Sequence, residues 1–260
     1  MALTGLEIYK LLPKTNCKKC GFPTCLAFAM KLSQKGIELS ACPDVSEAAK
    51  AALEAASRPP IRLITVGTGE KAFSVGNELV LFRHEKTFVN EPGLMITVRD
   101  SDSADAVARL VGEVAGYSVE RVGKNLGVNG FAIKNVSGDK SVFAAAAGAV
   151  ASQTDLPLAL ISSDPAAIEA ALGKLDGRNP LIYGATKDNA AEMAALALKH
   201  KCPLAVVSSS GLDELVSTVE TVTKAGVQDI VLDPGTRGFS DSLAALVQIR
   251  RLALKKNFRP

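Results

Sequence analysis

Four cysteines close together near the start of the chain are the residues whose type and spacing most clearly carry chemistry. Cys17, Cys20, Cys25 and Cys42 follow the pattern C-x2-C-x4-C-x16-C, whereas the fifth cysteine, Cys202, lies far along the chain. Four thiolates can hold one [4Fe–4S] cluster, with one thiolate on each iron. Because no secretory signal opens the chain, such clustering favours a metal or redox site over disulfide bonds. We therefore expect an iron–sulfur cluster with these four cysteines as its metal ligands.

Two other interpretations of the same cysteines stay open. Structural zinc also takes four cysteine ligands, although zinc sites more often carry two C-x2-C pairs, and only Cys17 and Cys20 have that spacing. The thiols would otherwise be packing groups of a hydrophobic core. Around a cluster, Gly21 would let backbone amides approach a sulfur, and Lys18 and Lys19 would raise the cluster's potential or dock an electron donor.

The elements that position these cysteines form a small helical head, expected over residues 1–57. Its helices are expected over residues 4–12, 25–35 and 46–57, capped by Thr4, Thr24 and Ser46. The second helix ends at Gly36, and Arg58-Pro59-Pro60 breaks the third and marks a boundary. The head is therefore expected to be a separate [4Fe–4S] domain.

Residues 58–92 are predicted to be a linker or β-rich connector. Ile61–Val66 and Glu78–Phe82 are strand candidates, and Gly67-Thr68-Gly69 and Gly76-Asn77 are turn candidates. The Gly-Thr-Gly stretch would suit a phosphate, but no clear helix follows it, so a turn is favoured.

From residue 93 to residue 260, short apolar runs alternate with alanine-rich helical stretches. The strand candidates are Leu94–Val98, Phe131–Lys134, Leu158–Ile161, Leu181–Tyr183, Leu204–Val207 and Ile230–Leu232. The clearest helices are Ala166–Lys174, Asn189–His200, Leu212–Ala225 and Ser240–Lys256. This alternation predicts right-handed βαβ units and a parallel sheet. Without a dinucleotide fingerprint, a TIM-type βα barrel fits better than a doubly wound sheet. With six strands where a barrel has eight, we expect an α/β barrel that is incomplete at its C-terminal end.

The composition excludes several classes of protein. The chain has 260 residues, and its 30 basic and 27 acidic side chains give a net charge of +3, too balanced for a protein that binds nucleic acid or a membrane surface. With 47% hydrophobic and 22% charged residues, the chain is not intrinsically disordered. No apolar run approaches the roughly 18 residues of a membrane span. We expect a cytoplasmic protein with no nucleic-acid or membrane partner.

Polar residues follow several of the predicted strands, at the end of a barrel where active sites lie. They are Asp100, Ser162, Ser163, Thr186, Ser208 and Asp233. A methyltransferase barrel that binds a pterin would use such positions, but loop capping and subunit contacts explain them more simply. Neither His84 nor His200 has a visible nucleophile or metal partner, and Cys202 reads as a packing thiol. We therefore assign no catalytic residue.

Stretches along essentially the whole chain resemble the large (gamma) subunit of the corrinoid iron–sulfur protein, part of the carbon monoxide dehydrogenase/acetyl-CoA synthase system. The first is LTGLEIYKLLPKTNCKKCGFPTCLAFAMKL, which contains three of the four cysteines. The others are ACPDVSEAA, ELVLFRHEKTF, NPLIYGAT, CPLAVVSSSGLDEL, DIVLDPGTR and QIRRLALKK. The cysteine loop alone is less specific, and the motifs of the body narrow the resemblance to this subunit.

The resemblance implies that Cys17, Cys20, Cys25 and Cys42 match the family's cluster ligands. It also implies that the body is a TIM-type barrel, that a small subunit forms a heterodimer with it, and that a later domain holds a corrinoid. The corrinoid site is therefore expected beyond Pro260, and no corrinoid contact can be named here. Such a protein is a methyl carrier and electron relay of the reductive acetyl-CoA pathway, not a stand-alone catalyst.

In that role, the family moves a methyl group from methyltetrahydrofolate and its methyltransferase to acetyl-CoA synthase. Its cluster takes an electron from a low-potential donor and returns Co(II) to Co(I). Two alternatives remain: a pterin-type methyltransferase barrel with an accessory cluster, and an iron–sulfur electron-transfer module that has no corrinoid.

Overall fold

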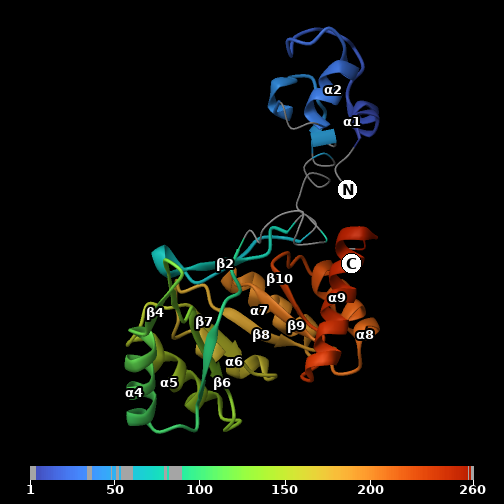
Figure 1. The fold of residues 1–260 in the computed structure, drawn as a ribbon. Helices are drawn as coiled ribbons and strands as arrows, with labels where there is room; N and C mark the ends of the chain where they lie inside the picture. Colours follow the sequence, from blue (N-terminus) through green and yellow to red (C-terminus); the bar gives the residue numbers. More distant parts are fainter. Residues whose placement is uncertain are drawn as a thin grey trace. The chain divides into compact units, whose positions relative to one another are not determined.

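The computed structural model describes residues 4–33, 37–47, 49–50, 53, 61–78, 81, 90–256 and 258. The chain divides into two compact units, Met1–Pro60 and Ile61–Pro260, which we call the head and the body (Figure 1). The described residues of the expected connector, 61–78, 81 and 90–92, thus belong to the same compact unit as the sheet that follows them.

The described part of the head includes two short helices and one turn of 3-10 helix. They are α1 (Gly5–Leu11), α2 (Cys25–Ser33) and η1 (Leu39–Ala41). Thr4 caps α1 reciprocally with Glu7, since its hydroxyl accepts from the Glu7 amide at 3.3 Å and its own amide donates to the Glu7 carboxylate at 2.7 Å. The Thr24 hydroxyl accepts from the Ala27 amide at 3.1 Å and begins α2. Both predicted caps are confirmed.

Two sequence predictions for the head fall partly outside the described residues. The expected end of the second helix at residues 34–36 lies there, and so does most of the third helix, expected over 46–57. Of that helix, the cap is visible, because the Ser46 hydroxyl accepts from the Ala49 amide at 3.2 Å.

The head has its own hydrophobic core, centred on α2. Phe28 is fully buried there, and the ring of Phe22 meets it edge-on with the centroids 5.8 Å apart. Ile8 and Leu12 bring α1 into the same cluster. This core anchors both ends of α2, so it fixes the cysteines that flank the helix.

The body is built on six parallel strands. They are β3 (Met95–Arg99), β6 (Gly130–Lys134), β7 (Leu158–Ile161), β8 (Leu181–Ala185), β9 (Leu204–Val207) and β10 (Ile230–Asp233). Hydrogen-bonded neighbours follow the order β10-β9-β8-β7-β6-β3. All six predicted strands are confirmed, and the largest boundary error is at β8, which continues to Ala185 instead of ending at Tyr183.

A helix follows each of these strands. They are α4 (Ala104–Ala115), α5 (Lys140–Ala151), α6 (Pro165–Leu172), α7 (Ala190–His200), α8 (Leu212–Lys224) and α9 (Phe239–Lys255). In Figure 1 the chain alternates strand and helix from β6 to α9. The α/β class is therefore confirmed, and the four predicted helices are found within two residues of their expected ends.

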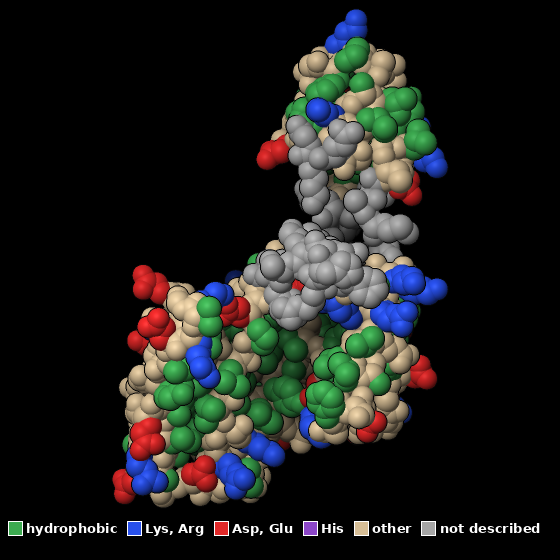
Figure 2. Space-filling model, viewed as in Figure 1, with side chains coloured by type: hydrophobic (Ala, Val, Ile, Leu, Met, Phe, Trp, Pro, Cys, Tyr) green, Lys and Arg blue, Asp and Glu red, His purple; other side chains and the backbone are tan. Residues whose placement is uncertain are grey.

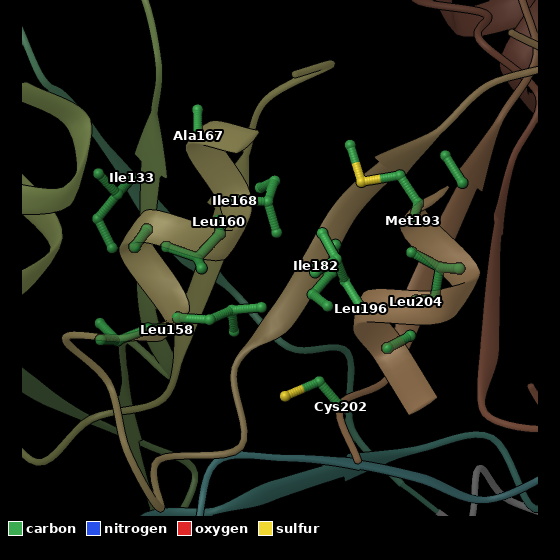
Figure 3. Close-up of a cluster of buried hydrophobic side chains, with 14 of the residues drawn as sticks. Ile133, Leu158, Leu160, Ala167, Ile168, Ile182, Met193, Leu196, Cys202 and Leu204 are labelled. Carbon is green, nitrogen blue, oxygen red and sulfur yellow. The ribbon is translucent and has the colours of Figure 1, made fainter. Parts of the chain in front are cut away.

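The pleat of the strands separates two different faces of the sheet. Ile133, Leu160, Ile182 and Leu204 are paired across neighbouring strands, are fully buried, and pack against the helices. Figure 3 shows these side chains meeting Ile168 and others from the helices. The helices thus cover this face of the sheet.

The opposite face carries the alternate residues of each strand. Ala132, Ala159 and Ala205 keep its middle small, and polar or charged side chains stand near the carboxyl ends of the strands. In Figure 2 the body is hollowed between the side that carries α4 and the side that carries α9, and hydrophobic side chains gather in the hollow.

Two small antiparallel pairs accompany the main sheet. One joins β1 (Ile64–Val66) to β2 (Phe73–Val75) around the turn η2 (Gly69–Lys71), and the other joins β4 (Ser118–Arg121) to β5 (Lys124–Gly127). The sequence did not predict β2, β4 or β5. The first strand begins at Ile64, not Ile61, and most of the expected strand Glu78–Phe82 lies outside the described residues.

Each new strand of the main sheet is added beside the one before it, without the reversal of a doubly wound sheet. A βα barrel grows in the same sequential way. In the part of the chain that the structure describes, β3 and β10 are the two edges of an open sheet. The TIM-type barrel therefore stays a prediction.

Candidate functional site

The head brings the four clustered cysteines to the ends of its short elements. Cys17 and Cys20 lie in the loop between α1 and α2, Cys25 is the first residue of α2, and Cys42 directly follows η1. All four thiols are free. Cys25 and Cys42 are buried in the hydrophobic core of the head, whereas Cys17 and Cys20 are partly exposed.

The loop before α2 is folded by residues in left-handed backbone conformations. Asn16, Lys18 and Gly21 have φ values of 51°, 62° and 82°. The amide of Gly21 donates to the carbonyl of Lys18 at 2.9 Å and closes a tight turn around Cys20. The Asn16 side-chain oxygen accepts from the amide of Cys25 at 2.8 Å, so the loop is tied back to the first turn of α2.

A second connection joins this loop to the segment around Cys42. The ammonium of Lys19 lies 3.0 Å from the carboxylate of Asp44. Lys19, and then a hydrogen bond with the thiol of Cys17, lower the pKa of Asp44. Because Asp44 contacts both residues, it holds the first part of the cysteine pattern beside the last.

The thiols are close enough to influence one another. Burial raises the pKa of the Cys42 thiol above its usual value, a hydrogen bond with the backbone of Asp44 opposes that shift, and the neighbouring Cys20, Cys17 and Cys25 raise the pKa further. The neighbouring cysteines raise the pKa of Cys42 because negatively charged thiolates repel one another. A bound cation would remove the repulsion, because a metal favours the deprotonated thiol.

The donor chemistry of this site fits iron or zinc, and both accept four thiolates. Within the part of the chain that the structure describes, no three His, Cys, Asp or Glu side chains converge as the ligands of a single metal ion would. The segments that carry the four cysteines are nonetheless linked by the contacts of Asn16 with Cys25 and of Lys19 with Asp44.

Most of the polar residues at the carboxyl end of the sheet form hydrogen bonds within or between the loops that follow the strands. Asp100 is buried, and its carboxylate accepts from the amides of Val136 and Ser137 at 2.8 and 3.0 Å and from the Ser137 hydroxyl at 2.6 Å. Burial favours the neutral acid, but these hydrogen bonds outweigh it and lower the pKa of Asp100. The Ser208 hydroxyl donates to the Gly211 carbonyl at 2.7 Å. These contacts agree with a capping role.

Three further residues of that set also make contacts within or between neighbouring loops. The Ser162 hydroxyl accepts from the Asp164 amide at 3.1 Å, and Thr186 donates its amide to the Asn189 side chain at 2.7 Å. Ser163 contributes its carbonyl oxygen, which accepts from the Asn189 side-chain amide at 2.8 Å.

Asp233 is different, because it forms a cluster with two side chains that the sequence analysis did not single out. It is the last residue of β10, and its carboxylate accepts from the Tyr183 hydroxyl and from both terminal nitrogens of Arg237, at 3.1 and 3.0 Å. Burial and the bond to Asp233 raise the pKa of Tyr183 to about 12. This cluster lies at the carboxyl end of the face that the helices leave uncovered.

The remaining candidates that the structure describes are buried groups or a turn. Cys202 is buried beside the main core, as Figure 3 shows, and burial raises the pKa of its thiol to about 11. The Nε2 atom of His200 is buried without a hydrogen-bond partner. Gly67-Thr68-Gly69 leads into η2 and not into an α-helix. His84 lies outside the described residues.

Two surface observations complete the description. A depression of about 580 Å³ lies between α5 and α6, and small side chains such as Ala144, Gly148 and Ala170 line it without any candidate site residue. In the described ranges, no helix is both long enough and apolar enough to cross a membrane.

Comparisons with known proteins match both units of the chain. Residues 63–260 match the family model "CO dehydrogenase/acetyl-CoA synthase delta subunit", and residues 12–43 match the model "Putative Fe-S cluster". The second match spans all four clustered cysteines.

Individual relatives extend the similarity over the whole chain. The "Corrinoid/iron-sulfur protein large subunit" of Moorella thermoacetica is 45% identical over 259 residues, which cover 100% of this chain and 58% of that protein. The "Acetyl-CoA decarbonylase/synthase complex subunit gamma 1" of Methanosarcina thermophila is 41% identical over 258 residues, covering 96% and 55%. The gamma subunit of Methanothermobacter thermautotrophicus is 37% identical.

The chain thus spans somewhat more than half the length of the curated relatives it matches. The family model nevertheless covers most of the body, and the relatives align with both units. The chain therefore belongs to the CO dehydrogenase/acetyl-CoA synthase delta subunit family and is a relative of the large (gamma) subunit of the corrinoid/iron–sulfur protein.

Proposed function

We propose that the head holds a [4Fe–4S] cluster through Cys17, Cys20, Cys25 and Cys42. The observation that carries the proposal is that two contacts tie the loop of Cys17 and Cys20 to the other two cysteines: Asn16 binds the amide of Cys25, and Lys19 pairs with Asp44 beside Cys42. The Fe–S family match over residues 12–43 supports it. Such a cluster, when bound, supplies one electron at low potential.

Each part of the head has a task in this proposal. Cys25 and Cys42 hold the buried side, and the hydrophobic core around them excludes water, which strengthens local electrostatic interactions. Asn16 fixes the position of Cys25 through its amide, and the Lys19–Asp44 ion pair holds Cys17 and Cys42 together. These contacts keep the segments that carry the four cysteines together.

We further propose that the chain works as the large subunit of a corrinoid methyl carrier. Its relatives are named as corrinoid/iron–sulfur and acetyl-CoA decarbonylase/synthase subunits. In this role a small subunit is its partner, and the methyl group passes from methyltetrahydrofolate and its methyltransferase to acetyl-CoA synthase. The head would pass an electron from a low-potential donor to return Co(II) to Co(I). We assign the corrinoid no residue of this chain.

The pterin-type barrel has weaker support. The side chains of Asp100, Ser162 and Ser208 already form hydrogen bonds with neighbouring loops, as described above. The Tyr183–Asp233–Arg237 cluster lies on the face of the sheet opposite the helices. It is the polar cluster of the body that a pterin-type methyltransferase would need to use.

The test is cobalt reduction in the complex that contains this chain. We would purify the chain anaerobically with its co-purifying partners and follow the Co(II) EPR signal during reduction by dithionite-reduced ferredoxin. The native chain and Cys202→Ala should lose the Co(II) signal, whereas Cys42→Ser should retain it. Equal loss of the signal in all three would overturn the relay role.

A further inference from the structure

The cysteine loop carries three positive charges, and an ion pair with a carboxylate balances only one of them. Residues 12–25 contain three lysines, Lys14, Lys18 and Lys19, and no acidic residue. All three lysines are exposed. Cys17 and Cys20, which lie among them, are the two more exposed thiols of the set. The lysines are therefore neighbours in the sequence of the two cysteines that solvent reaches.

The backbone and two contacts hold the lysines in this arrangement. Lys14 and Lys18 have left-handed backbone conformations, with φ values of 60° and 62°. The Lys14 ammonium lies 5.6 Å from the centre of the Tyr9 ring. Lys19 is paired with Asp44 at 3.0 Å, and Lys18 has no ion pair among the described residues. Two of the three charges are thus not neutralised by a carboxylate.

Other carboxylates of the head are occupied locally. Glu7 accepts the hydrogen bonds of the Thr4 cap, and Glu47 pairs with Lys50 at 2.8 Å. The positive field at the loop is therefore not cancelled by contacts from these two residues, and it falls off over about 10 Å at moderate salt.

We propose that Lys14, Lys18 and Lys19 form a docking surface for an acidic electron-donor protein. The inference rests on the proposed cluster and names the class of partner that reaches it. In the transfer step the reduced donor loses one electron and the head gains it, and no bond forms or breaks. Opposite charge steers such encounters and raises the association rate, whereas an apolar patch alone would not.

The experiment measures binding of the anaerobically purified chain to a bacterial two-cluster ferredoxin of net negative charge. Lys14→Glu/Lys18→Glu should weaken the affinity and slow association at least tenfold at about 20 mM salt, and the difference should largely vanish at about 0.5 M. Lys31→Glu is the matched control, because Lys31 is an exposed lysine in the last turn of α2, away from the loop. It should change the affinity less than about twofold, because Lys31 lies outside the proposed docking surface.

The outcomes separate this inference from the proposed cluster. Iron content and visible spectra of each variant are measured on the same samples. A chain that holds iron but binds the ferredoxin equally well in all variants overturns the docking surface. A chain that holds no iron overturns the cluster instead, whatever its affinity for the ferredoxin.

Discussion

Asp44 and Asn16 show how single residues connect distant parts of the cysteine pattern. Asp44 lies beside Cys42 but contacts Lys19 and Cys17, and Asn16 lies beside Cys17 but binds the amide of Cys25. The spacing of the cysteines predicts a shared site, but it does not identify these contacts. The structure adds the residues that keep the thiols together.

The tyrosine at the carboxyl end of the sheet provides a test at the same scale. The pKa of Tyr183 is raised to about 12, so its ionisation should come above the usual tyrosine range. Because the folded-state pKa exceeds the usual value of about 10, this group's stabilising effect is complete below about pH 10 and is lost as the pH rises through about 12.

Ultraviolet absorbance at high pH measures this titration directly. Tyr183→Phe should remove the ionisation step near about pH 12. Asp233→Asn should move the ionisation of Tyr183 toward about pH 10. An unchanged titration curve in Asp233→Asn would show that burial alone raises the pKa of Tyr183.

Sequence reasoning located the cysteines because their spacing is local, and it missed the Tyr183–Asp233–Arg237 cluster because its members meet only through the fold. Tyr183 and Asp233 are 50 positions apart and lie on strands separated by β9. Only the strand order brings them together. Asp233 was noticed by position alone, without its partners.

At the scale of elements, the periodic strands were found because their apolar runs are distinct. The β4–β5 hairpin was missed for a physical reason. All of its strand residues are exposed, so no alternation marks it, and its turn is Val122-Gly123 with both φ values positive. That turn normally uses Asn-Gly or Asp-Gly, and a valine at its first position conceals the signal.

Two glycines give opposite predictions within the body's elements. A Cβ on Gly130 of β6 would lie 2.2 Å from the Pro157 carbonyl oxygen, on the backbone before β7, whereas a Cβ on Gly112 of α4 meets nothing within 4 Å. Gly130→Ala should destabilise the chain by roughly 2 kcal/mol or more, since the strands must separate. Gly112→Ala should stabilise it by about 0.5–1 kcal/mol, because alanine favours a helix interior.

Urea denaturation of the body, followed by circular dichroism, compares these two variants. Gly112→Ala also serves as the control for adding a methyl group. If Gly130→Ala were as stable as the native chain, the close approach between β6 and the segment before β7 would be wrong.

At the scale of the whole molecule, the head and the body each have a hydrophobic core of their own. Phe28 is fully buried in one and Ile133 in the other. From the Arg58-Pro59-Pro60 break, the sequence predicts a head over residues 1–57, a connector over 58–92 and a barrel over 93–260. It could not show whether the six strands form a closed barrel, because closure depends on pairing between sheet edges.

Separate cores predict separate responses to core mutations. Phe28→Ala should destabilise the head by roughly 3–5 kcal/mol and leave the body unchanged, because the lost contacts belong to one cluster. Hydrogen exchange read by mass spectrometry should show faster exchange in residues 5–33 and unchanged protection in β6–β9. Ile133→Ala should give the reverse pattern. Loss of protection in both units from either variant would contradict their independence.

The most direct test of the account is the metal and sulfide content of the anaerobically purified chain, together with its EPR spectrum before and after dithionite. We predict about four iron and four acid-labile sulfide atoms per chain, and an EPR signal that appears on reduction. One zinc ion per chain with no sulfide and no reducible signal would contradict the account, because the four cysteines would then hold a structural metal that carries no electron.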